Sequence, residues 1–168
     1  MKKVILTIVA IAAFVFTVAA DNVANKTLSV NSYARIITPI TLANTDALDF
    51  GVIARGAASS TIVVGAVASP SVSVASGDAV VLTSAPQKAA KFTVSGESLK
   101  TYAITIPSTA TIISGSNNLT ITGFTCSNGA IGTIGTGDIF YVGGTLTVPS
   151  TAASASYSGT FNVTVAYN

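Results

Sequence analysis

Apolar and polar residues alternate along most of this chain, and this period of two constrains its fold more than any other feature. The clearest example is the C-terminal segment, where Phe161, Val163, Val165 and Tyr167 share one parity and polar or small residues occupy the other. Successive side chains of a β-strand point to opposite faces, so this segment is expected to be a half-buried strand. Helical spacing does not recur after residue 20, and an all-β fold is predicted.

The same alternation returns in short stretches separated by turn residues. Six of the breaks contain a glycine, usually near serine, asparagine or aspartate, as is typical of tight turns between strands. Strands are expected at 27–42, 48–53, 60–67, 71–75, 79–83, 90–95, 101–107, 109–113, 118–126, 139–148 and 156–167. Many short strands at this spacing predict a two-sheet sandwich, with a closed barrel as the alternative.

The N-terminus has the pattern of an export signal. Two lysines precede an apolar run, Val4 to Val18, and small residues come directly after it. The run is shorter than the roughly 20 residues that span a bilayer, so a cleaved signal peptide over 1–20 is favoured over a membrane anchor. The remaining chain is expected to form an N-terminal extension, 21–32, and one β-sandwich domain, 33–168, with no membrane span.

The charge balance argues against nucleic acid as a partner. The chain has eight Lys and Arg, of which two lie in the expected signal, so six remain against six Asp and Glu. A neutral chain has no basic stripe to neutralise phosphates, and no nucleic-acid binding is expected. A neutral surface also offers little electrostatic resistance to self-association.

Composition also argues against catalysis. The sequence contains no His and no Trp, so the usual general bases and metal ligands are scarce. We expect no enzyme, and we assign no catalytic, cofactor-binding or metal-binding residue. Asp46 and Asp49 supply too few oxygen ligands for a calcium ion and are expected to cap the turn before the strand at 48–53. Asp138 is expected to shape the turn before Ile139.

Cys126 is the only cysteine in the chain. It shares strand parity with Phe124, which favours a role as a small core residue. An intermolecular disulfide is the alternative, because no internal partner exists.

Five segments, taken in order, carry a resemblance to a protein family. They are Leu48-Asp-Phe-Gly-Val-Ile53, Lys91-Phe-Thr-Val-Ser-Gly96, Tyr102-Ala-Ile-Thr-Ile-Pro107, Val142-Gly-Gly-Thr-Leu-Thr-Val148 and Tyr157-Ser-Gly-Thr-Phe-Asn-Val-Thr-Val-Ala-Tyr167. Their order resembles that in a family of bacterial exported proteins catalogued as a domain of unknown function. That family looks like the subunits of chaperone–usher pili of the archaic and spore-coat-like type. The resemblance implies an immunoglobulin-like sandwich that lacks one strand and is completed by a donor strand from a neighbouring subunit.

The resemblance also implies which residues assemble the subunits. The donor strand would lie within 21–32, where Leu28 and Val30 share a face that Lys26 interrupts. The groove that receives it would be walled by the C-terminal strand, through Phe161, Val163, Val165 and Tyr167. The chain departs from many such subunits in lacking a cysteine pair, and its Gly159 lies at a different distance from the C-terminus.

The expected function is therefore that of a structural subunit of a bacterial surface fibre, a pilus or fimbria, that supports adhesion or biofilm. The expected partners are further copies of the chain in a homo-polymer, a periplasmic chaperone and an outer-membrane usher. The expected location is the cell surface or the extracellular space, after transit through the periplasm.

Two other functions compete with the fibre subunit. One is a self-contained secreted or periplasmic β-sandwich binding domain of unknown ligand, in which Leu28 and Val30 begin the first strand. The other is a sugar-binding tip domain. It is less favoured, because Tyr141 is the one tyrosine whose surroundings suggest an exposed aromatic platform.

Overall fold

The computed structural model describes residues 25–82, 87–135 and 137–168. The expected signal peptide lies outside the described residues. The chain divides into an N-terminal unit that ends at Arg35 and a second unit, Ile36–Asn168. Residues 25–40 form no strand, so the strand expected at 27–42 is wrong except for its last two residues.

The second unit is all-β, as predicted. Its strands are β1 (Thr41–Asp46), β2 (Val52–Ala54), β3 (Ser60–Val64), β4 (Val72–Ser76), β5 (Val80–Leu82), β6 (Ala90–Ser95), β7 (Thr101–Thr105), β8 (Thr109–Ser114), β9 (Asn117–Cys126), β10 (Ile131–Thr133), β11 (Asp138–Val148) and β12 (Thr164–Tyr167). Nowhere in the described chain is there a helix long and apolar enough to cross a membrane.

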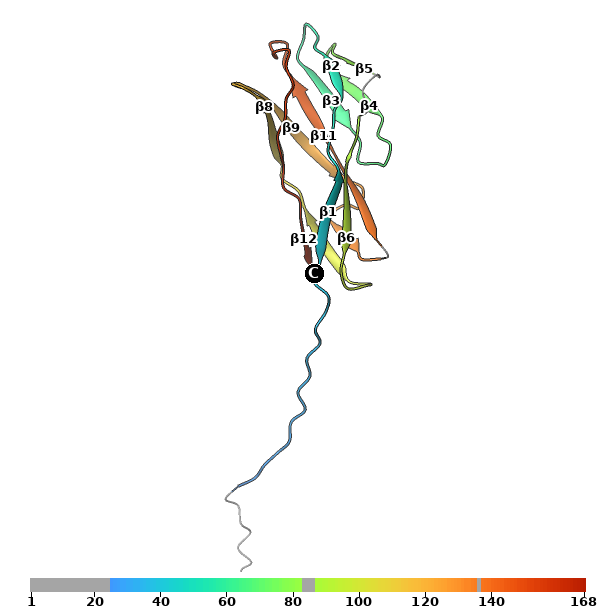
Figure 1. Ribbon diagram of the computed structural model, residues 1–168, viewed down its shortest axis with the longest axis vertical. Coiled ribbons are helices and arrows are strands. Elements are labelled where there is room, and N and C mark those ends of the chain that lie inside the picture. Colours follow the sequence, from blue (N-terminus) through green and yellow to red (C-terminus); the bar gives the residue numbers. More distant parts are fainter. Residues whose placement is uncertain (1–24, 83–86, 136) are drawn as a thin grey trace, which may run out of the picture. The chain divides into compact units, whose positions relative to one another are not determined.

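The strands form a sandwich-like arrangement around a curled main sheet (Figure 1). The main sheet has seven strands, in which β11 is central. One edge of β11 pairs first with β6 and then with β3, while its other edge pairs with β9. A second sheet of three strands runs in the order β10-β7-β12, and β2 and β5 form a small ribbon. All of these pairings are antiparallel, which agrees with the short connections in the sequence.

A glycine allows β11 to change partner halfway along. Gly143 lies between the stretch that pairs with β6 and the stretch that pairs with β3. A Cβ atom there would overlap the carbonyl oxygen of Val64 and lie 2.7 Å from the backbone nitrogen of Ala66. The close approach of these backbones therefore requires the residue without a side chain.

Two hydrophobic clusters form the core. The first lies among β3, β9 and β11 and is covered by the inward face of the β2–β5 ribbon, through Ile53 and Val81. The second lies between β6 and β11 of the main sheet and β7 of the smaller sheet. At its centre Phe92 and Phe140 stack with ring centroids 5.1 Å apart. The predicted sandwich is thus confirmed, with the second cluster between its two layers.

We expect Phe140→Ala to lower the free energy of unfolding by about 3–5 kcal/mol, because the ring is fully buried and stacked. The matched control is Ile139→Ala on the preceding residue of β11, whose side chain is 41% exposed and whose loss should cost about 1 kcal/mol or less. Denaturant unfolding followed by circular dichroism measures both. Equal losses of unfolding free energy would contradict the assignment of Phe140 to the buried face of β11 and of Ile139 to its exposed face.

Asp78 makes the stability of the turn before β3 depend on pH. Its carboxylate accepts hydrogen bonds from the backbone N–H groups of Ala58 and Ala57 at 2.9 and 2.8 Å, and these bonds lower the pKa of Asp78 below its ordinary value of 3.8. The stabilisation is therefore complete above pH 3.8 and is lost as the pH falls through the lower folded pKa. We expect Asp78→Asn to be less stable near neutral pH and to lose less stability on acidification. If the wild type and Asp78→Asn lose the same free energy of unfolding on acidification, the Asp78 carboxylate does not stabilise this turn.

Candidate functional site

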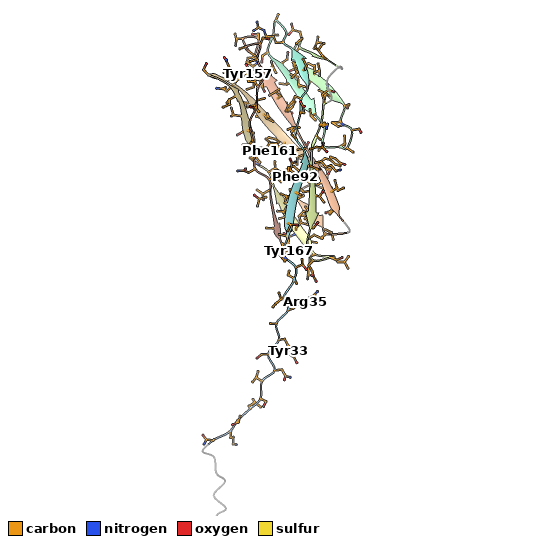
Figure 2. The ribbon with its side chains drawn as sticks, in the orientation of Figure 1. Tyr33, Arg35, Phe92, Tyr157, Phe161 and Tyr167 are labelled. Carbon is orange, nitrogen blue, oxygen red and sulfur yellow. The ribbon has the colours of Figure 1, made fainter. Side chains whose placement is uncertain are left out.

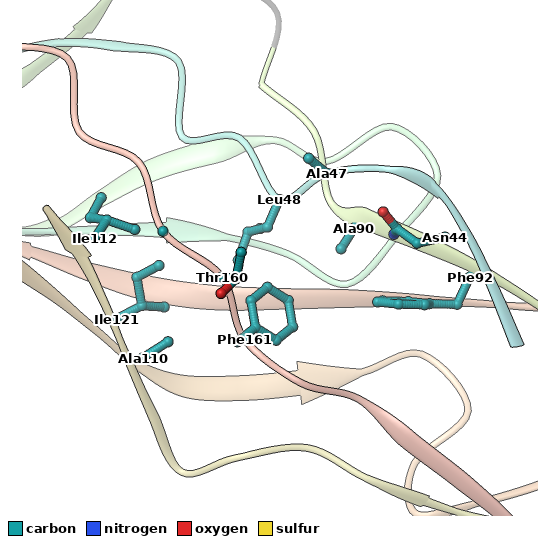
Figure 3. Close-up of a pocket in the computed structure, with 11 residues that line it drawn as sticks. Asn44, Ala47, Leu48, Ala90, Phe92, Ala110, Ile112, Ile121, Thr160 and Phe161 are labelled. Atoms are coloured by element: carbon teal, nitrogen blue, oxygen red, sulfur yellow. The ribbon is translucent and has the colours of Figure 1, made fainter.

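An apolar groove opens at one side of the sandwich, between the region of β1 and the segment that leads into β12 (Figure 3). It encloses a cavity of about 260 Å³. The side chains that line it are mostly aliphatic or aromatic, with Asn44 and Thr160 as the polar exceptions. They come from Asn44, Ala47, Leu48, Ala90, Phe92, Ala110, Ile112, Ile121, Gly159, Thr160 and Phe161. We call this feature the edge groove.

One edge strand borders the edge groove, and a second follows the segment that lines it. β1 contributes Asn44, is the last strand on its side of the main sheet and pairs with β6. β12 follows the lining residues 159–161, is the last strand of the smaller sheet and pairs with β7. Among the described strands, neither has a ladder partner on its other edge. An unpaired strand edge presents a row of N–H and C=O groups that can pair with a further strand. The groove therefore combines an apolar floor with backbone groups suited to strand addition.

The C-terminal residues singled out from the sequence lie together on one face. Phe161, Val163, Val165 and Tyr167 are all half-buried and pack against the second core cluster, and the residues between them are exposed. Only Thr164–Tyr167 is a regular strand, so the strand expected at 156–167 is shorter than predicted. The four side chains reach the core but remain partly uncovered.

A bulge in β9 sets the position of Phe161. In the pairing of β9 with β11, the two residues Gly123 and Phe124 lie opposite Gly144, and Gly123 has a positive φ of 57°. Such a bulge redirects the side chain that follows it. Phe124 packs against Phe161 with ring centroids 4.9 Å apart. The wall of the edge groove thus depends on a local irregularity of a neighbouring strand.

The hydroxyl group of Tyr167 has a role that the alternation does not reveal. It donates a hydrogen bond to the carbonyl oxygen of Thr38 at 2.7 Å and accepts one from the N–H of Glu97, also at 2.7 Å. Thr38 and Glu97 are 129 and 70 residues away from Tyr167 along the chain. The only sequence signal for this contact is Gly96, where a Cβ atom would overlap the hydroxyl oxygen.

The other two predicted site residues lie in the N-terminal unit. Leu28 and Val30 are 85% and 78% exposed, in a stretch without strand pairing that also carries exposed Tyr33 (Figure 2). The structure therefore brings the four C-terminal residues together and leaves Leu28 and Val30 in a separate unit. The assembly role assigned to all six residues stays a prediction.

The acidic residues make structural contacts. Asp49 accepts a hydrogen bond from the N–H of Gly51 at 2.8 Å, which is the turn-capping role predicted for it. Asp46 pairs instead with Lys88 at 3.2 Å. The described residues contain no group of three or more acidic, His or Cys side chains arranged to hold a metal ion. Tyr141 is half-buried and lines a polar cavity of about 170 Å³ with Asp46 and Lys88.

Tyr102 and Cys126 belong to the core. Tyr102 is fully buried, and its hydroxyl donates to the carboxylate of Asp138 at 2.5 Å. Burial, and then this bond, raise the pKa of Tyr102. Asp138 thus anchors a buried hydroxyl in addition to its position at the start of β11. Cys126 is half-buried against the second cluster, as predicted, and burial raises the pKa of its thiol.

Gly159 allows the C-terminal segment to lie against β8. A Cβ atom there would overlap the carbonyl oxygen of Thr111 and lie 3.0 Å from the Cα of Ile112. We expect Gly159→Ala to destabilise the domain by about 1–3 kcal/mol. It should also speed hydrogen exchange at Ser158, whose N–H bonds to the carbonyl of Ile113 at 3.0 Å. Gly65→Ala is the matched control, because a Cβ atom at Gly65 meets nothing within 4 Å. If the two variants behave alike, the segment does not depend on this close contact.

Comparison with known proteins places the chain in a family. Residues 40–167 match the family described as a domain of unknown function (DUF4402). No curated protein and no solved structure matches the chain. Because the match spans β1 to β12 and most of the sequence, the chain belongs to the DUF4402 family.

Proposed function

We propose that this chain is a structural subunit of a bacterial surface fibre and that each copy is completed by a strand from the next. The observation that carries the proposal is the edge groove, an apolar cavity of about 260 Å³ beside the unpaired edge of β1. Half-buried aromatic and aliphatic side chains beside unpaired backbone are what a missing strand would leave behind.

A strand suits the edge groove better than a compact ligand does. Among the groove-lining side chains, only Asn44 and Thr160 offer polar groups, so little is present to orient a small polar molecule. An added strand would instead bond to the backbone edge and place alternate side chains on the apolar floor. Phe161, Val163 and Val165, which are half-buried, would become fully covered.

The N-terminal stretch of a second copy has the properties of that strand. Leu28, Val30, Ala34 and Ile36 share one parity, with Ser32 as the polar member of the row, and the residues of this stretch are exposed and form no strand. In an extended conformation, the nine residues 28–36 span roughly 25–30 Å, about the length of a long strand. The inserted segment in this proposal therefore extends beyond residue 32, through Ile36. Lys26 ends the apolar row on its N-terminal side.

The proposal includes partners and a location. A groove of this kind favours aggregation until it is filled, so a chaperone that covers Phe161 and its neighbours during periplasmic transit is part of the proposal. An outer-membrane usher would then exchange the chaperone for the next subunit. Without the expected signal peptide, six basic residues balance six acidic ones, which suits close packing of copies in a fibre that supports adhesion or biofilm.

The proposal is tested by placing a charge on each face of the inserted strand. We expect Leu28→Asp and Val30→Asp to abolish assembly, because the new carboxylate would enter an apolar groove without a partner. Ser29→Asp is the matched control, since it adds the same charge to the opposite face. Material sheared from the cell surface is run on a denaturing gel, unboiled and boiled. The wild type and the control should give a ladder in the unboiled lane that collapses to monomer on boiling, because strand addition unfolds slowly.

Two results would overturn the proposal. Ladders of equal intensity for all variants would show that Leu28 and Val30 do not enter a groove. A monomer band alone for the wild type, in both lanes, would favour the self-contained secreted binding domain.

A further inference from the structure

We propose that the Tyr167 hydroxyl is a latch that prevents the N-terminal stretch from entering the groove of its own domain. Tyr167 is then a positioning residue that commits the inserted strand to a second copy. This inference rests on the proposed function, because it concerns the same groove and the same strand.

Insertion of residues 28–36 into the groove of the same chain would compete with insertion into a second copy. Only four residues, 37–40, separate Ile36 from the start of β1 at Thr41. Four-residue connections are common in β-hairpins, so a turn over these residues would allow 28–36 to fold back along the free edge of β1. That edge borders the same groove, and insertion within one chain costs no loss of translational freedom. Chain length alone therefore does not enforce assembly between copies.

The contacts of Thr38 oppose this turn. Thr41 pairs with Ser95 in the β1–β6 ladder, and the N–H of Thr38 lies 3.4 Å from the Glu97 carboxylate. The chain before β1 thus continues beside the residues that follow β6, within one residue of the ladder register. Pro39 restrains Thr38 to an extended conformation as well. A hairpin over 37–40 would require Thr38 to leave this position.

The Tyr167 hydroxyl holds Thr38 and Glu97 together. It bonds both to the Thr38 carbonyl and to the Glu97 N–H at 2.7 Å, so it joins the two segments that a hairpin would separate. The ring packs half-buried against the second core cluster, which fixes the hydroxyl in place. The absence of a side chain at Gly96 leaves the space that the hydroxyl occupies.

Removal of the hydroxyl should therefore shift insertion from a second copy to the same copy. Tyr167→Phe keeps the ring in the core and deletes both hydrogen bonds of the latch. The chain after signal removal is refolded from denaturant at low concentration, and monomers are separated from oligomers. Hydrogen exchange with mass spectrometry then reports the protection of residues 28–36 in the monomers. We expect the ratio of protected to unprotected monomers to rise about fivefold for each hydrogen bond lost, or about 25-fold for the two.

Two further variants sharpen the test. Gly96→Ala places a methyl group where the hydroxyl lies and should act like Tyr167→Phe. Tyr157→Phe is the matched control, because it also deletes a tyrosine hydroxyl bond, to the Ala153 carbonyl at 3.0 Å, but its ring packs against the first core cluster, whereas that of Tyr167 packs against the second. It should leave the monomers unprotected at 28–36.

The outcomes separate the latch from the proposed function. If oligomers protect residues 28–36 in every variant and the monomers never do, the fibre proposal stands and the latch is wrong. If Tyr157→Phe shifts the monomers as much as Tyr167→Phe does, the effect is general destabilisation, and the latch is again wrong. If the wild type protects 28–36 in neither monomers nor oligomers, both proposals fail.

Discussion

The central constraint in this structure is the incomplete burial of the apolar side chains near the C-terminus. Phe161, Val163, Val165 and Tyr167 pack against the second core cluster, yet each remains partly exposed. Burial of apolar surface is the main favourable term in folding, so a domain with an exposed wall of this kind gains stability when another strand covers it. The row of exposed apolar residues at 28–36 is the strand that we propose covers this surface in another copy.

The rest of the fold holds this open side in a defined shape. Gly143 allows one edge of β11 to pair first with β6 and then with β3, which extends the main sheet on the side opposite β9. The bulge at Gly123 supports the groove wall through the contact between Phe124 and Phe161. Gly159 brings the C-terminal segment close to β8. Three glycines thus determine the shape of the edge groove, and the strand proposed to fill it belongs to a second copy of the chain.

Much of this architecture is predictable from the alternation in the sequence, and the exceptions have physical causes. β6 has the predicted bounds because both of its edges are paired and one of its faces is buried. Residues 27–40 also alternate, with Ser32 and Thr38 as breaks, but form no strand, because alternation indicates a face that can be buried and not whether a neighbouring strand is present to pair with it. β10 is missed because three residues carry no detectable period. The Tyr167 bonds are missed because they join segments whose proximity depends on the completed fold.

The most direct test of the central claim is electron cryomicroscopy of the native surface material at a resolution that shows side chains. The account predicts an additional strand in the edge groove, along the free edge of β1, with the side chains of residues 28–36 alternately facing the groove and with its chain continuing into a different copy. A groove that is empty, or that is filled by residues 28–36 of the same copy, would contradict the account.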